Sequence, residues 1–166
     1  MEILFENRYF VTKDVFAEFL KGTVLKKTRV LSLVLMVMDF IIIYIVIKEK
    51  KSYGELIGFC LIFLLAVALY FLHIRIGKNM YNNTLEFHTG KLKESILRFG
   101  EEAIMLEEGK TFMEFEYSQI KKIYELKKLY VLMLGKQNGI VLRKDSFSVG
   151  TIYKFRDFIK EKCRSV

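Results

Sequence analysis

The chain has 166 residues, of which 52% are hydrophobic, contains no Pro and no Trp, and carries a formal net charge of +8. This apolar content is too high for an ordinary soluble domain of the same length, and the excess lies between residues 30 and 76. Residues 77–166 hold 17 Lys and Arg against 12 Asp and Glu, without the concentrated basic stripe or the motif of a nucleic-acid-binding protein. We therefore expect a membrane module and a mildly basic soluble module, and no nucleic-acid partner.

Residues 1–29 precede the first apolar run and predict a strand followed by an amphipathic helix. The strand is indicated by β-formers in residues 2–11, and the helix by Thr12 as an N-cap and by apolar residues at helical spacing after it. We expect this helix to lie against the membrane or the soluble domain. It is followed by a basic cluster, which is either a topology signal or a contact with the membrane interface: Lys26, Lys27 and Arg29.

Two apolar runs, residues 30–47 and 56–76, are separated by a short loop. Eighteen residues of helix extend about 27 Å, close to the thickness of one hydrocarbon core. Two such runs in tandem predict a transmembrane helical hairpin over residues 30–76. Eight Lys and Arg flank the outer ends of the hairpin against three in the loop, which predicts a multi-pass protein of the cell membrane with both termini in the cytoplasm.

Asp39 is an acidic residue in the middle of the first apolar run. A carboxylate at this depth costs about 3 kcal/mol, which the apolar residues of the helix outweigh, so the helix is still expected to insert. Asp39 is either a protonated or snorkelling side chain without a role, or a contact inside a homo-oligomer or with another membrane protein.

Residues 77–166 predict an antiparallel meander closed by a helix. Short apolar or alternating runs, separated by turn signals, cover residues 96–99, 103–106, 111–117, 120–126, 129–134 and 139–142. Asn138-Gly139 is a strong hairpin-turn signal, because both residues tolerate positive φ. From about residue 150, an aromatic and aliphatic stripe predicts one amphipathic helix packed on the sheet.

The run EFEYSQIKKIYE at residues 114–125, the run VLRKDSF at 141–147 and the helix after them resemble the C-terminal domain of the YcxB-like membrane proteins. The resemblance covers residues 95–163. It implies two transmembrane helices followed by a small pleckstrin-homology-like (PH-like) domain, and so a membrane α+β fold with an antiparallel β-sandwich or barrel closed by a C-terminal helix. It implies no catalytic or ligand residue. The sequence departs from the family pattern at residues 142–144, where a Pro is expected before the Lys.

Most motif residues have structural roles in this interpretation. Tyr117 and Ile120 fill the core across a turn, Ser118 caps that turn, and Phe147 packs under the helix. The remaining motif residues are Glu125, Lys144 and Asp145. Lysines at the turns are either solvated or hold one face against anionic headgroups: Lys121, Lys122, Lys127 and Lys128.

The sequence has no phosphate-binding loop, no dinucleotide-binding motif, no nucleophilic triad and no metal-ligand spacing. We therefore expect a non-enzymatic membrane protein without cofactor or small-molecule substrate. Its PH-like domain would bind a protein, a peptide or anionic lipid headgroups near the bilayer. The alternative is an accessory subunit of a larger membrane complex, such as a transporter or an envelope-stress system, docked through the hairpin.

Overall fold

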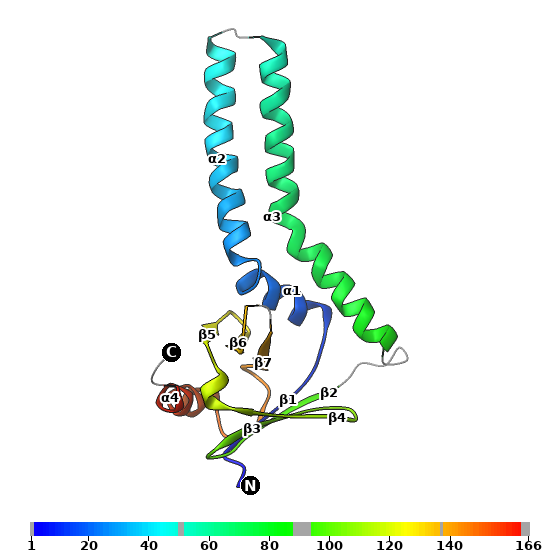
Figure 1. Cartoon of the computed structure of the whole chain (residues 1–166), viewed down its shortest axis with the longest axis vertical. Coiled ribbons are helices and arrows are strands. Elements are labelled where there is room, and N and C mark those ends of the chain that lie inside the picture. The colour runs from blue at the N-terminus through cyan, green and yellow to red at the C-terminus, as the bar shows by residue number, and fades with distance from the viewer. Residues whose placement is uncertain (1, 50–51, 88–93, 137, 164–166) are drawn as a thin grey trace.

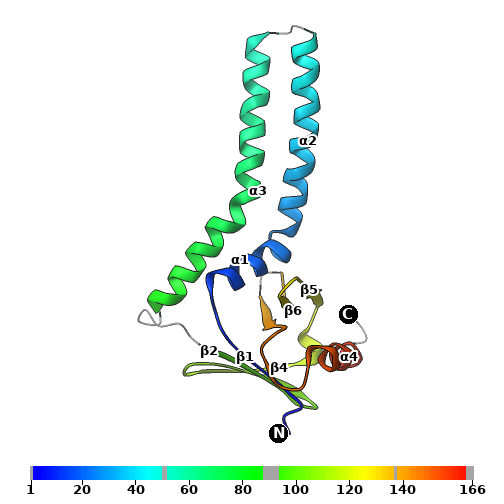
Figure 2. The same ribbon diagram turned by 180° about the vertical axis from the view of Figure 1, so that it is seen from behind.

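The computed structural model describes residues 2–49, 52–87, 94–136 and 138–163. It has a mixed α+β fold, in which two long helices form a hairpin and two antiparallel sheets with a C-terminal helix form the other end of the molecule (Figure 1). The first described strand and the last described helix both lie at the sheet end, as the reverse view also shows (Figure 2). The predicted order of modules is therefore present.

The hairpin consists of α2 (Lys26–Lys48) and α3 (Tyr53–Phe87), and both helices are long and apolar enough to cross a membrane. The expected helix limits, 30–47 and 56–76, are too short. α2 starts earlier because Lys and Arg are good helix formers. α3 continues past residue 76, where its lower part turns away from α2 (Figure 1) and packs against the N-terminal helix.

Residues spaced by seven are buried between the two helices. They are Ser32, Asp39 and Val46 on α2, and Ala66 and His73 on α3. A spacing of seven keeps the same face of each helix on its neighbour, as in antiparallel coiled coils. The other faces of the hairpin carry exposed large apolar side chains.

The first strand, β1 (Phe5–Phe10), lies inside a five-stranded antiparallel sheet in the order β4-β3-β2-β1-β8. The other strands are β2 (Glu94–Phe99), β3 (Ala103–Glu108), β4 (Thr111–Glu116) and β8 (Phe147–Val149). β1 pairs with β2 from Phe5↔Phe99 to Phe10↔Glu94. The expected division of the chain at residue 77 is therefore wrong for this sheet, because the strand before the hairpin pairs with the strand after it.

The second sheet contains β5 (Lys122–Glu125), β6 (Leu129–Met133) and β7 (Gly139–Arg143), and the 3₁₀ turn η1 (Tyr117–Gln119) leads into it. The predicted strands are present within a few residues, whereas β8 was not expected. The predicted Asn138-Gly139 turn is wrong in detail: Gly139 is the first residue of β7 and has no positive φ. Instead, the backbone carbonyl of Asn138 accepts from the amides of Leu134 and Gly135.

The C-terminal helix α4 (Ile152–Lys162) closes the core between the two sheets. Phe155 of α4 is fully buried, and the centroid of its ring lies 5.4 Å from that of Phe5, 4.7 Å from that of Phe99 and 5.8 Å from that of Tyr130. These partners belong to β1, β2 and β6, so one side chain joins both sheets. The predicted lid helix is confirmed.

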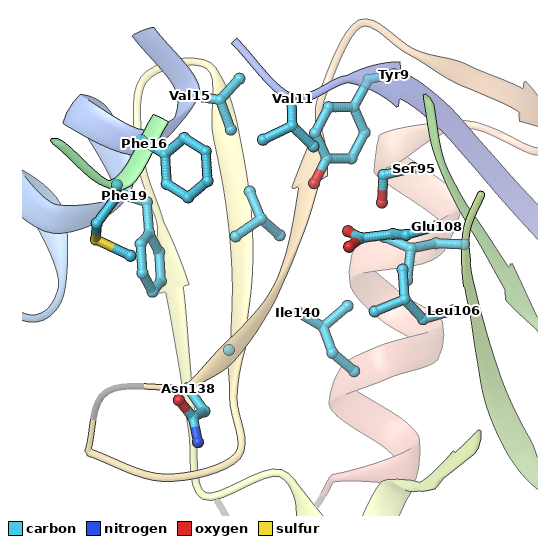
Figure 3. Close-up of a pocket in the computed structure, with 14 residues that line it drawn as sticks. Tyr9, Val11, Val15, Phe16, Phe19, Ser95, Leu106, Glu108, Asn138 and Ile140 are labelled. Atoms are coloured by element: carbon cyan, nitrogen blue, oxygen red, sulfur yellow. The ribbon is translucent and has the colours of Figure 1, made fainter. Parts of the chain in front are cut away.

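The N-terminal helix α1 (Lys13–Gly22) packs on the sheet end of the molecule through its buried residues Val15, Phe19 and Leu20. The predicted contact with the sheets is therefore present, and the predicted contact with a membrane stays a prediction. Gly77 of α3 allows the backbone of Ala17 to approach closely, since a Cβ there would lie 3.3 Å from the Ala17 Cα. Between α1 and the sheets is a cavity of about 310 Å³ (Figure 3).

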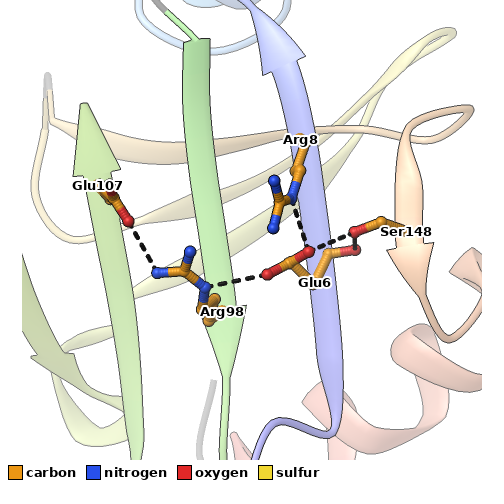
Figure 4. A network of polar contacts seen from close by, with 5 residues as sticks. All are labelled: Glu6, Arg8, Arg98, Glu107 and Ser148. Atoms are coloured by element: carbon orange, nitrogen blue, oxygen red, sulfur yellow. Dashed lines mark hydrogen bonds and ion pairs between the residues drawn. The ribbon is translucent and has the colours of Figure 1, made fainter. Parts of the chain in front are cut away.

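Glu6 joins three strands on the outer face of the five-stranded sheet (Figure 4). Its carboxylate accepts from Arg8 Nε at 2.7 Å, from Arg98 Nε at 3.0 Å and from the Ser148 hydroxyl at 2.7 Å. Arg98 also donates to Glu107 on β3 at 2.8 Å. The hydrogen bond from Arg8, followed by those from Ser148 and Arg98, lowers the pKa of Glu6 to about 2 although burial opposes the shift.

Phe155→Ala is expected to lower the free energy of unfolding by about 3 to 5 kcal/mol, the usual cost of deleting a buried aromatic ring. Chemical denaturation of the detergent-solubilised chain, followed by circular dichroism, measures this loss. Tyr153→Ala on the exposed side of α4 is the matched control and should change the free energy by less than about 1 kcal/mol. An equal loss of unfolding free energy in the two variants would contradict the role of Phe155 in joining the two sheets.

Glu6→Gln is expected to flatten the acid dependence of stability. A carboxyl whose pKa is lowered on folding stabilises the protein above its usual pKa, and this contribution is lost as the pH falls toward the folded-state value. Between pH 6 and pH 3 the wild type should lose about 1 to 2 kcal/mol that the variant does not lose. Glu114→Gln on exposed β4 should leave the wild-type acid dependence unchanged, and a Glu6→Gln profile identical to wild type would contradict the account.

Candidate anion-binding cleft at the base of the hairpin

A cleft of about 670 Å³ lies where the hairpin meets the sheet end of the molecule. We call it the basal cleft. α1, the first turns of α2, the middle of α3 and the turn between β5 and β6 contribute to it. Its lining consists of Ala17, Glu18, Lys21, Gly22, Lys26, Arg29, Val30, Leu33, Tyr70, His73, Leu126 and Lys127.

Cationic side chains from three elements converge on the basal cleft. Lys21 comes from α1, Lys26 and Arg29 come from α2, and Lys127 comes from the β5–β6 turn. Among the lining residues, Glu18 is the one carboxylate, and its Oε1 accepts a hydrogen bond of 2.8 Å from the amide of Lys128. The cleft therefore has a surplus of positive charge. The Glu18 carboxylate holds the β5–β6 turn against α1 through its hydrogen bond with Lys128.

Arg29 is positioned by stacking. Its guanidinium lies 4.6 Å from the ring centroid of Tyr70, a cation–π contact that fixes the plane of the guanidinium. The Nε of Arg29 is buried and has no hydrogen-bond partner among the residues that the structure describes. A buried N–H of a charged group is costly without an acceptor. Arg29 is therefore suited to receive an anionic oxygen from a molecule in the cleft.

The apolar part of the basal cleft is formed by residues of α2 and of the β5–β6 turn. Val30 and Leu33 come from α2, and Leu126 comes from the β5–β6 turn. Gly22 lets this turn approach α1, because a Cβ at that position would run into the Leu126 side chain. Since cations and apolar side chains line the same cleft, it fits a molecule with both an anionic group and an apolar stem.

A second group of basic side chains adjoins the cleft around Tyr124. The amino groups of Lys26 and Lys122 lie 5.8 Å and 5.0 Å from the centroid of this ring. Lys26 lines the cleft and also contacts the sheet, so the basic surface continues from α2 onto β5.

The structure brings together two sets of basic residues that the sequence analysis treated separately. Lys26 and Arg29 meet Lys127 in the basal cleft, and Lys122 joins them through Tyr124. The remaining predicted lysines have exposed side chains outside the lining: Lys27, Lys121 and Lys128. Sequence analysis missed Tyr70 and His73, because nothing in an apolar run marks which polar residue faces a cleft.

Asp39 is only 4% exposed and lies on the face of α2 that packs against α3. In the described part of the chain, its Oδ2 has no hydrogen-bond partner. Of the two alternatives for Asp39, a contact inside a homo-oligomer or with another membrane protein would require α3 to move, because α3 covers the side chain in this structure. The sequence could not show this, since it does not give the rotation of α2 about its axis.

The motif residues at the entrance to the second sheet have structural contacts. Tyr117 donates to the carbonyl of Gly100 at 2.7 Å, and Ile120 is buried. The predicted role of Ser118 as the cap is wrong: Glu116 and Gln119 form a capping box around η1, and the Ser118 hydroxyl donates to Glu116. Side-chain length explains the difference, because Gln119 can reach back to the backbone at the start of the turn.

Among the other motif residues, Glu125 and Phe147 join the strands to α4. The Glu125 carboxylate pairs with Lys144 at 2.9 Å and with Arg156 of α4, and the hydrogen bond from Lys144 lowers the pKa of Glu125. Asp145 pairs with Arg143 at 2.6 Å. The ring of Phe147 lies 5.4 Å from that of Phe155, as expected for a residue packed under the helix.

Among residues 2–49, 52–87, 94–136 and 138–163, no group of three or more His, Cys, Asp or Glu side chains could hold a metal ion. The absence of a metal or another cofactor in the cell stays a prediction. The basal cleft contains cationic side chains, an arginine stacked on Tyr70 and an apolar floor. These features suit the binding of a molecule.

Residues 99–159 match the family model described as YcxB-like protein. The match begins at the end of β2 and ends near the end of α4, so it includes Leu126 and Lys127 of the basal cleft but not the hairpin or α1. No curated protein and no solved structure matches the chain. The predicted family resemblance is thus confirmed over these residues.

Asp39→Val is expected to raise the free energy of unfolding by about 1 to 3 kcal/mol, because it removes a buried polar group that lacks a partner in the described structure. Titration with a denaturing detergent, followed by helix content, measures the stability of the hairpin. Val46→Ala at the same helix contact only removes packing and should lower stability. A loss of stability in Asp39→Val would show that the carboxyl has a stabilising partner.

Proposed function

We propose, for a chain whose residues 99–159 are a YcxB-like family domain, that it is a non-enzymatic membrane protein whose basal cleft binds the phosphate of an anionic lipid headgroup. The hairpin crosses the bilayer of the cell membrane, and the sheets and α4 form a cytoplasmic PH-like unit beneath it. Binding holds this unit at a fixed place on the membrane surface, where it can meet partners.

The surface of the hairpin supports the membrane crossing. α2 and α3 expose large apolar side chains over most of their length, which would be unfavourable in water. Both helices enter from the same end of the molecule, so a crossing hairpin leaves both termini on one side. The surplus of Lys and Arg at the outer ends of the hairpin favours the cytoplasmic side.

The convergence of four cations at the foot of the hairpin is the observation that carries the proposal. The cleft includes Arg29 and Val30 in the first turns of α2. In the proposed crossing hairpin, this is the depth at which a bilayer changes from headgroups to acyl chains. Each Lys or Arg at such a surface contributes about 1 kcal/mol of attraction to anionic lipid. The apolar floor beside the cations would receive the start of an acyl chain.

The arrangement of the sheets supports the PH-like assignment. Two antiparallel sheets pack around one core, and a C-terminal helix closes it, as the family resemblance implied. One difference is that β1 comes from the segment before the hairpin. The unit that would bind lipid is therefore built from both sides of the hairpin.

The alternative function, an accessory subunit docked through the hairpin, has to use the outward apolar faces of α2 and α3 rather than Asp39. These faces suit lipid and protein equally well. The basal cleft favours lipid binding because the accessory role would not require cations at this depth.

Arg29→Gln combined with Lys127→Gln is expected to weaken binding of dioctanoyl phosphatidylglycerol about tenfold or more, since two headgroup cations of about 1 kcal/mol each are removed. Native mass spectrometry of the full chain in neutral detergent, over a series of lipid concentrations, measures the affinity. Dioctanoyl phosphatidylcholine should bind more weakly than phosphatidylglycerol to the wild type. Competition by glycerol 3-phosphate would show how much of the affinity resides in the phosphate alone.

Lys110→Gln combined with Lys136→Gln is the matched control, because it removes the same charge from exposed turns outside the basal cleft. These variants should retain the wild-type affinity. Equal affinity for the two lipids, or equal loss in both double variants, would refute the cleft as a headgroup site.

A further inference from the structure

The cavity beneath α1 is separate from the basal cleft, and we call it the α1 cavity. α1 forms a wall of both: Val15 and Phe19 face the α1 cavity, whereas Glu18 and Lys21 face the basal cleft. Its other walls come from β1, β2, β3 and β7, so it lies between the two sheets (Figure 3). Its volume of about 310 Å³ is enough for a small organic molecule.

The walls of the α1 cavity are mostly apolar, but one side is polar. Tyr9 of β1 and Ser95 of β2 are directly opposite each other in the strand pairing, and Glu108 lies beside them (Figure 3). Burial raises the pKa of Tyr9, and the nearby Ser95 hydroxyl partly opposes this rise. Tyr9 is therefore a neutral hydroxyl that can donate a hydrogen bond at physiological pH.

Ser95 is 1% exposed, and its hydroxyl makes no hydrogen bond of ordinary geometry within the described parts of the chain. Leaving such a hydroxyl unsatisfied costs more than the bond would contribute, so buried hydroxyls are nearly always partnered. A water molecule could serve at the polar side, but the aliphatic and aromatic walls offer no partners to further waters. An occupant that completes the cavity must be polar at one end and apolar over the rest.

From this geometry we propose that the α1 cavity binds a small neutral amphiphile, a mainly apolar molecule with one hydroxyl or carbonyl group. Its polar group accepts from or donates to the hydroxyls of Ser95 and Tyr9, and its apolar part lies against Val15, Phe19 and Ile140. The neighbouring Glu108 carboxylate disfavours an anionic head, because two like charges would lie close together. Exposed Met80 and Asn138 mark the side from which the molecule enters.

The test uses the full chain in lipid nanodiscs with ¹³C-labelled isoleucine δ1-methyl groups, and octan-1-ol as the probe. Ile140 lines the α1 cavity, Ile159 of α4 is buried in the core away from this cavity, and Ile62 is exposed on the hairpin. Octanol should shift the Ile140 signal saturably and leave that of Ile159 in place. A linear drift of the Ile62 signal reports octanol dissolved in the lipid.

Specific binding predicts three further results. Octanoate should bind at least tenfold more weakly than octanol at Ile140 because of the carboxylate of Glu108. Ser95→Ala should weaken octanol binding about fivefold to tenfold, the usual effect of one lost hydrogen bond. Leu106→Phe, which fills part of the cavity, should abolish the saturable shift while the Ile159 signal shows that the core is intact.

Two outcomes would overturn the proposal. If the Ile140 signal only drifts in parallel with that of Ile62, the cavity holds water and no amphiphile. If octanol binds saturably but equally well to Ser95→Ala, the cavity takes any apolar solute and the hydroxyl pair has no role in recognition. Both outcomes would leave the lipid site in the basal cleft unaffected, because that site lies on the other side of α1.

Discussion

The pairing of β1 with β2 is the constraint on which the architecture depends. β1 precedes the hairpin and β2 follows it, yet their six residues are aligned side by side in one sheet. This pairing brings the two ends of an apolar hairpin back to the same folded unit. Phe5 of β1 also contacts Phe155 of α4, so the N-terminal strand belongs both to the sheet and to the core. A soluble domain that began after the hairpin would lack the strand between β2 and β8.

The positions of the basal cleft and the α1 cavity follow from this constraint. The chain runs from β1 directly into α1, so α1 is held between the sheets and the hairpin. One side of α1 covers the gap between the sheets and forms the α1 cavity, whereas the other side faces α2 and α3 and forms the basal cleft. The cations of the cleft thus come from segments about a hundred residues apart in the sequence, Lys26 and Lys127 among them.

Local patterns in the sequence were sufficient to predict most helices and strands, but they predicted neither the basal cleft nor the α1 cavity. Apolar runs and alternation predict the hairpin, the strands and α4, because these patterns reflect burial of one helix or strand at a time. Strand order and helix rotation depend on contacts between distant segments, and a single sequence does not contain them. For this reason, the sequence indicated a strand near Phe5 but not its place in the sheet, and marked Asp39 as unusual without showing that it faces α3. The basic residues were recognised individually, and only the fold unites them.

Disulfide trapping across the β1–β2 pair tests the central claim most directly. In a chain without Cys60 and Cys163, cysteines replace Arg8 and Ile96, which are directly opposite each other, or Arg8 and Glu114, which lies on β4 beyond two intervening strands. Opposed residues of an antiparallel pair have the separation that a disulfide requires. After cleavage in the loop between α2 and α3, mild oxidation should hold the two fragments together for the first pair and not for the second. Fragments that separate for the first pair would contradict the account, because β1 would then not lie beside β2.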